Sequence, residues 1–135
     1  MRARLLLATI LAAAFAAPAL AQGDAEAGEK VFAKCKACHM VGADAKNRVG
    51  PLLTGVIGRE IASVPDFKYS DAFMEKKAEG FTWTEENLAA YLAEPKDFIP
   101  GNKMAFVGLK KEEDIANVLA YLAAEGGESG EAGGS

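Results

Sequence analysis

The two cysteines and the only histidine of the chain fall within five consecutive residues, Cys35-Lys36-Ala37-Cys38-His39. A C-x-x-C-H run is the pattern through which c-type haem is attached: the two thiols add across the haem vinyl groups, and the adjacent imidazole ligates the iron. A pair of cysteines at this spacing could instead form a disulfide, a thioredoxin-like redox pair or half of a metal site. The spacing therefore offers cofactor attachment, redox chemistry of the thiols, or metal binding.

The rest of the chain favours haem attachment over a disulfide, a redox pair or a metal site. A zinc site needs two further nitrogen or sulfur ligands, and the sequence has no other Cys and no other His. A thioredoxin-like pair follows a strand of a parallel sheet. Here the residues before Cys35 have the apolar spacing of a helix, with Ala27, Val31 and Phe32 on one face.

A bound haem iron needs a second axial ligand, and methionine is the leading candidate because His/Met ligation is typical of cytochromes c. Met1 belongs to the leader described below, and Met40 adjoins the histidine and cannot reach the opposite haem face. Met74 lies in a short predicted helix, where a methionine ordinarily fills a gap in the core. Met104 follows the Pro100-Gly101 turn and is expected on a loop, so the residues favour Met104 while leaving Met74 open.

Several other side chains could serve such a site. A ligating imidazole usually donates its second N–H to a carbonyl or carboxylate, and the Gly50-Pro51 turn is the nearest source. Hydrogen bonds to haem propionates or to the methionine sulfur could come from Arg59, Tyr69, Trp83 and Tyr91. Their ordinary alternative is an aromatic residue in a small core or an arginine on the surface.

The elements that must position these residues are helices. The predicted helical segments run from Asp24 to the cysteine pair, over 70–78, from Thr82 to the residue before Pro95, in one turn over 95–98, and over 111–124. Thr82 and Glu85 form a T-x-x-E capping box. No credible strand appears, so we expect an all-α fold of about five short helices around one haem.

The two ends of the chain have their own compositions. Residues 1–21 begin Met-Arg-Ala-Arg, continue with about 13 apolar residues and end Ala19-Leu20-Ala21, which predicts a secretory signal peptide cleaved after Ala21. A membrane anchor is the alternative, but a spanning helix needs about 20 residues. Residues 22–125 would form the haem domain. Gly126 is expected to end the last helix, and 126–135 is expected to be a disordered acidic tail without a large apolar residue.

Removal of the leader leaves 13 Lys and Arg against 19 Asp and Glu, a net charge of −6. This charge argues against non-specific nucleic-acid binding, which needs a basic surface. Four lysines nevertheless flank the expected haem edge: Lys34 and Lys36 beside the cysteines, and Lys96 and Lys103 beside the methionine loop. We expect these four to dock transiently on acidic sites of larger partners, with the chain acting as a monomer.

Further motifs accompany the C-x-x-C-H run in order: Gly28-x-x-x-Phe32 before it, then Gly50-Pro51-x-Leu53, Gly58-Arg59, Phe67-x-Tyr69, Thr82-Trp83, Tyr91-Leu92, Pro95-Lys96, Ile99-Pro100-Gly101-x-Lys103-Met104-x-Phe106 and Ala120-Tyr121-Leu122. In this order they resemble the motifs of the class I, mitochondrial-like cytochromes c of bacteria and mitochondria, over nearly all of residues 24–125. Two features depart from that family: Asn102 stands where Thr is usual, and the segment from Ser70 to Gly80 is slightly longer than in the mitochondrial proteins, with Phe73 near the family's buried Asn.

The resemblance implies a particular set of site roles. His39 and Met104 would ligate the iron, the Pro51 carbonyl would accept from His39, and Tyr91 would reach the Met104 sulfur. The propionates would be served by Arg59, Tyr69 and Trp83. Gly28 and Phe32 would pack against Val118 and Tyr121 and so join the first and last helices.

The resemblance also implies a function. The chain would be a soluble periplasmic monohaem carrier, with haem c attached through Cys35 and Cys38. It would pass single electrons from a quinol-oxidising cytochrome bc complex to a terminal oxidase or a photosynthetic reaction centre. An enzyme such as a small haem peroxidase would need an open axial site and a distal acid or base, and there is no second histidine. A redox domain tethered to a larger complex is the other alternative.

Overall fold

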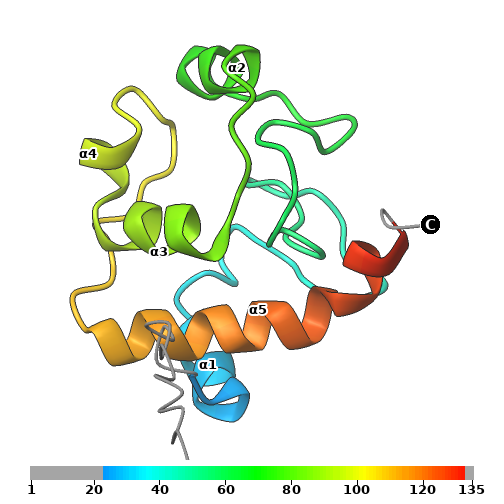
Figure 1. Cartoon of the computed structure of the whole chain (residues 1–135), viewed down its shortest axis with the longest axis vertical. Helices are drawn as coiled ribbons and strands as arrows, with labels where there is room; N and C mark the ends of the chain where they lie inside the picture. The colour runs from blue at the N-terminus through cyan, green and yellow to red at the C-terminus, as the bar shows by residue number, and fades with distance from the viewer. Residues whose placement is uncertain (1–22, 133–135) are drawn as a thin grey trace, which may run out of the picture.

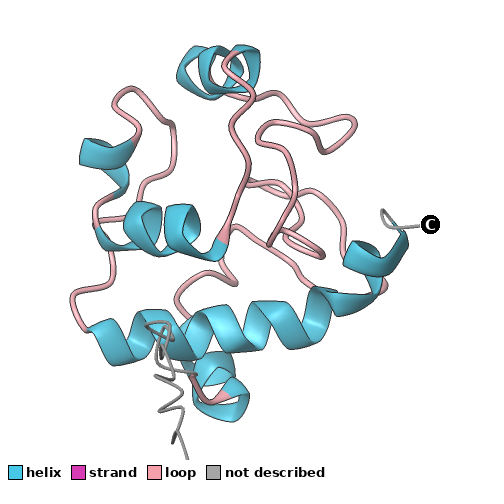
Figure 2. Ribbon diagram, in the orientation of Figure 1, coloured by secondary structure: helices cyan, strands magenta, loops and turns pink. Residues whose placement is uncertain are grey.

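The fold is helical in the computed structural model, which describes residues 23–132. Its helices are α1 (Ala25–Phe32), α2 (Asp71–Ala78), α3 (Glu85–Ala93), α4 (Pro95–Phe98) and α5 (Glu112–Ala132). The described residues contain no strand (Figure 2), only an isolated antiparallel bridge between Glu60 and Thr82. The expected all-α fold of about five helices is therefore confirmed. The predicted signal peptide, residues 1–21, lies outside the described residues.

Helix α1 starts where the sequence predicts. The Asp24 carboxylate accepts a hydrogen bond from the Ala27 N–H at 3.1 Å, which satisfies one of the free donors of the first turn. The Asp24 N–H donates to Asn117 Oδ1 at 2.8 Å, which ties the start of α1 to α5. The helix ends at Phe32, and a series of tight turns then leads into the cysteine pair.

Helices α1 and α5 cross in close contact, while α2, α3, α4 and the long loops lie on the other side of α5 (Figure 1). The crossing is close because Gly28 has no side chain: a Cβ there would lie 2.8 Å from the Tyr121 Cβ. Phe32 is 2% exposed, and its ring centroid lies 5.3 Å from that of Tyr121. The expected packing of the first and last helices is confirmed.

The expected start of α3 is wrong by two residues. The capping residue is Thr84, whose side chain accepts from the Asn87 N–H at 3.1 Å, and not Thr82. Thr82 is held in extended pairing with Glu60, and the next residue, Trp83, donates its N–H to the Arg59 carbonyl at 2.8 Å. A local T-x-x-E pattern cannot register this contact, because its partner lies more than twenty residues away.

The expected end of α5 at Gly126 is also wrong, because the helix continues to Ala132. Gly126 is buried, and a Cβ there would lie 2.9 Å from the Gly55 Cα. The glycine therefore permits close packing of the helix on the loop at Gly55, and this contact outweighs its low helix propensity. The segment expected to be disordered from Gly126 onward is thus helical as far as Ala132. Within the described residues, no helix is both long and apolar enough to cross a membrane.

Candidate functional site

The cysteines and the histidine are positioned by tight turns that follow α1 directly. The Cys35 N–H donates to the Phe32 carbonyl at 2.8 Å, and the His39 N–H donates to the Cys35 carbonyl at 2.9 Å. Both thiols are free and both line the same cavity as His39. Burial raises the pKa of the Cys35 thiol, and Lys34 partly opposes this. The turn therefore presents two thiols and one imidazole to a single space.

The His39 ring is oriented by the main chain of the Gly50-Pro51 turn. Its Nδ1 lies 2.7 Å from the Pro51 carbonyl oxygen, so Nδ1–H donates and the Nε2 lone pair is left free. A Cβ on Gly50 would lie 2.8 Å from both ring nitrogens. Burial lowers the pKa of His39, the positive charge of Arg59 adds to this, and the Pro51 bond partly opposes it. A neutral, oriented imidazole is the form that ligates a metal.

The cavity that these groups face has a volume of about 320 Å³. Most of its wall is apolar, and none of the apolar residues that form it was assigned to the site from the sequence: Leu53, Val56, Phe67, Leu88, Leu92, Phe106, Leu109, Val118 and Leu122. Helical periodicity marks the residues on the helices as buried. It does not show that they surround a space instead of packing on one another, so sequence reasoning missed this role.

Met104 enters the cavity from the loop between α4 and α5. The Tyr91 hydroxyl donates to the Met104 sulfur, with 3.7 Å between the two atoms. Tyr91 is 5% exposed, and burial raises its pKa well above the usual range, so the phenol remains a donor. Met74 is 48% exposed and does not line the cavity. Of the two methionines that the residues left open, only Met104 reaches the site.

Arg59, Tyr69 and Trp83 all line the cavity, as expected. The Arg59 guanidinium donates to the carbonyls of Thr54 at 3.1 Å and Leu52 at 3.2 Å. The Tyr69 hydroxyl accepts from the Val64 N–H at 3.1 Å. Burial lowers the pKa of Arg59 and raises that of Tyr69, and each group opposes the shift of the other. Their expected contacts with haem propionates stay a prediction.

The four lysines expected to dock a partner have different surroundings. Lys34 and Lys103 line the cavity, and so does Lys68, which the sequence reasoning missed. The Lys96 ammonium donates to the Asn102 carbonyl at 3.0 Å and therefore also holds the loop before Met104. Lys36 lies away from this cavity, at a second hollow.

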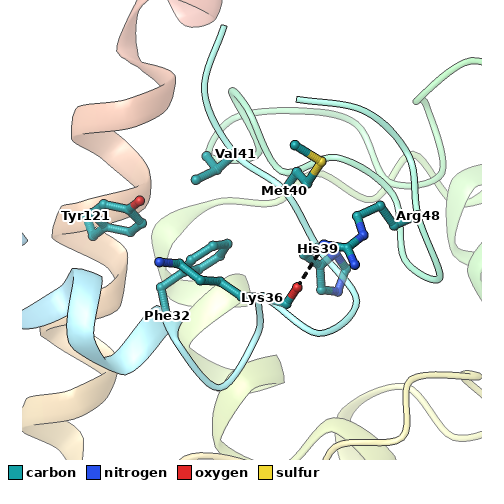
Figure 3. Close-up of a pocket in the computed structure, with 7 residues that line it drawn as sticks. All are labelled: Phe32, Lys36, His39, Met40, Val41, Arg48 and Tyr121. Atoms are coloured by element: carbon teal, nitrogen blue, oxygen red, sulfur yellow. Dashed lines mark hydrogen bonds between the residues drawn. The ribbon is translucent and has the colours of Figure 1, made fainter. Parts of the chain in front are cut away.

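This second hollow, of about 330 Å³, borders His39. Figure 3 shows Arg48 reaching toward the cysteine-histidine turn, where its Nη1 donates to the Lys36 carbonyl at 3.2 Å. Phe32, Val41 and Tyr121 form its apolar part, and Met40 completes its wall. Arg48 thus holds the turn that carries the thiols, and nothing in its sequence context indicated this contact.

Two free thiols beside an oriented imidazole, all facing one mainly apolar cavity, define the class: a protein that binds haem covalently. The donor set fits haem c, because two thiols that line the cavity can form thioethers with the haem vinyl groups and the adjacent imidazole can ligate the iron. The family model described as Cytochrome c matches residues 25–124. The chain belongs to the cytochrome c family.

Curated relatives of the chain support its membership of this family. The chain is 48% identical over 101 residues to cytochrome c2 of Agrobacterium tumefaciens, covering 75% of this chain and 91% of that one. It is 50% identical over 117 residues to cytochrome c-554 of Methylosinus trichosporium, covering 87% of this chain and 86% of that one. Among solved structures, cytochrome c2 from Rhodospirillum centenum has a TM-score of 0.73 at 42% identity, covering 76% of this chain and 98% of that one.

The family and the relatives together show that this chain is an electron carrier and not an enzyme. Its cofactor is haem c, attached covalently through Cys35 and Cys38.

Proposed function

We propose that this chain is a soluble periplasmic cytochrome with His39 and Met104 as its axial ligands. It carries single electrons from a quinol-oxidising cytochrome bc complex to a terminal oxidase or a photosynthetic reaction centre. One observation supports the ligand pair above all: both side chains line the same cavity, and each is oriented by its own hydrogen bond. The relatives named cytochrome c2 and the predicted signal peptide support the carrier role and the compartment.

The haem iron supplies the one-electron couple, and the surrounding protein sets its reduction potential. The thioether of Met104 is a soft ligand that favours ferrous iron. The Tyr91 hydroxyl draws electron density from the sulfur and so weakens its donation to ferric iron further. The mainly apolar wall of the cavity would disfavour the more highly charged oxidised state of a bound haem.

Ligation of the iron by both residues would also account for a carrier that has no substrate reaction. With His39 and Met104 both holding the iron, a small molecule would have no free ligand position to enter. A docked partner would then exchange electrons with a haem held in this cavity. In this proposal Lys34, Lys36, Lys96 and Lys103 present positive charge to acidic sites on that partner, and Lys68 joins them at the cavity wall.

Spectroscopy of the ferric protein tests the ligand pair. We expect the red charge-transfer band of a methionine bound to ferric iron, and Met104→Ala should abolish it because no other thioether of residues 23–132 lines the cavity. Met74→Ala is the matched control and should keep the band, since Met74 is largely exposed. A pyridine haemochrome assay on each variant checks that haem c remains attached. Loss of the band in Met74→Ala, with retention in Met104→Ala, would contradict the assignment.

A further inference from the structure

Asn102 is one of two polar residues that are buried in the described part of the chain; the other, Ser70, caps α2. It is 5% exposed and stands two residues before Met104. A buried carboxamide is costly unless all of its donors and its acceptor are satisfied, so its partners indicate what it stabilises.

The partners of the Asn102 side chain are all main-chain groups, on both sides of the turn that leads to Met104. Its Nδ2 donates to the carbonyl oxygens of Pro95 and Ile99, at 2.8 Å each. Its Oδ1 accepts from the Met104 N–H at 2.9 Å. One side chain therefore connects the first residue of α4, the residue after its end, and the backbone of Met104.

The α4 side of this connection is well anchored. Pro95 is among the largest fully buried side chains, and Ile99 is 1% exposed. The Asn102 main chain is fixed as well, because its N–H donates to the Ile99 carbonyl at 3.2 Å and its carbonyl accepts from the Lys96 ammonium at 3.0 Å. The Met104 N–H is thus bonded to a buried frame.

Met104 needs such support because it lies outside any helix and its side chain has three rotatable bonds. Tyr91 touches only the far end of that side chain, at the sulfur. The backbone end is held within the described residues by the Asn102 carboxamide at its N–H and by the Phe106 N–H, which donates to the Met104 carbonyl at 3.0 Å.

We propose that Asn102 is a positioning residue for Met104: its carboxamide holds the Met104 backbone against α4 and so suppresses opening of the methionine–iron bond. Only a side chain with two donors and one acceptor makes all three bonds. A threonine hydroxyl, with one donor, cannot bond both carbonyls and accept from the Met104 N–H in the same geometry. This inference rests on the proposed Met104 ligation.

Binding of external imidazole to the ferric protein measures this opening. Imidazole reaches the iron only when Met104 has left, so its apparent affinity rises in proportion to the open fraction. We expect Asn102→Ala to bind imidazole at least about tenfold more tightly than the wild type, which corresponds to about 1.4 kcal/mol. Asn102→Thr keeps one hydroxyl and should give a smaller increase. If Asn102→Ala does not fold, Asn102→Thr alone decides.

The matched control is Asn117→Ala. Asn117 also accepts a main-chain N–H through Oδ1, from Asp24 at 2.8 Å, but it does not line the cavity. It should lose stability while its imidazole affinity stays that of the wild type. An unchanged imidazole affinity in a folded Asn102 variant, or an equal increase in Asn117→Ala, would overturn the positioning role.

A second readout separates this inference from the ligation on which it rests. In the folded holoprotein, the Met104 amide should exchange its hydrogen at least about tenfold faster in Asn102→Ala than in the wild type, because its acceptor is gone. If the wild-type protein lacks the methionine band, the ligation is wrong, and exchange at the Met104 amide still decides whether Asn102 holds this backbone. Unchanged exchange would overturn the inference even where the band is present.

Discussion

The hydroxyl of Tyr91 is a single group whose removal should change the redox chemistry without changing the fold. Its ring packs against Trp83, with 5.0 Å between centroids, and against Phe73, with 6.0 Å, and phenylalanine would keep both contacts. Only the bond to the Met104 sulfur would be lost. We therefore treat Tyr91 as the residue that adjusts the donor strength of the thioether.

Tyr91→Phe should lower the midpoint potential. Without the hydrogen bond the sulfur donates more strongly and stabilises ferric iron. A hydrogen bond of about 0.5–1.5 kcal/mol corresponds to about 20–65 mV for one electron. Potentiometric titration measures the shift, and Tyr121→Phe, at the α1–α5 contact outside the cavity, should leave the potential unchanged. A higher potential in Tyr91→Phe would show that the bond acts in the opposite sense.

At the residue scale, the sequence motifs predict well which side chains line the site. They predict poorly the hydrogen bonds that orient each of these side chains. Cys35, Cys38, His39 and Met104 could be located because their chemical types are rare in this chain. The role of Asn102 could not, since its three bonds depend on the fold of the turn that follows α4. Arg48 was missed for the same reason.

At the scale of elements, the starts of α1 and α2 were predictable from their local caps, whereas the start of α3 and the end of α5, which distant contacts help to set, were not. Asp24 and Ser70 cap α1 and α2 through side-chain bonds three residues along the chain. Thr84 and the end of α5 depend on residues 58–60 and on Gly55, which no local pattern includes. Tertiary contact overrides local propensity at both of these boundaries.

The packing of α5 on the loop at Gly55 gives a prediction that opposes helix propensity. Gly126→Ala in a free helix would stabilise it by about 1 kcal/mol. In this structure the new methyl group would overlap the Gly55 backbone, so we expect a net loss of about 1–3 kcal/mol.

Chemical denaturation of the holoprotein measures this change, and Ala124→Gly provides the comparison. Ala124 is exposed, so that substitution should cost only about 0.5–1 kcal/mol through helix propensity. A Gly126→Ala variant that is more stable than the wild type would contradict the close contact at Gly55.

At the scale of the whole molecule, net charge and local charge point to different partners. The charge of −6 that removal of the predicted leader would leave is unsuited to acidic docking sites. Yet Lys34, Lys68 and Lys103 converge at the cavity, although they are far apart in the sequence. The acids Glu112, Glu113 and Asp114 occupy the first turn of α5 and do not line that cavity. An uneven distribution of this kind orients an encounter even when the total charge is unfavourable.

The salt dependence of electron transfer tests this docking face. Rates with a purified cytochrome bc complex should fall as ionic strength rises, because exposed charges are screened beyond about 8 Å at physiological salt. Lys34→Glu or Lys103→Glu should slow the second-order rate by about tenfold at low salt, with the haem spectrum unchanged. Lys76→Glu is the control, since Lys76 is paired with Glu79 at 3.2 Å and does not line the cavity, and it should change the rate by less than about twofold. Rates that rise with salt, or an equal loss in Lys76→Glu, would mean that apolar contacts and not these lysines bring the haem edge to its partner.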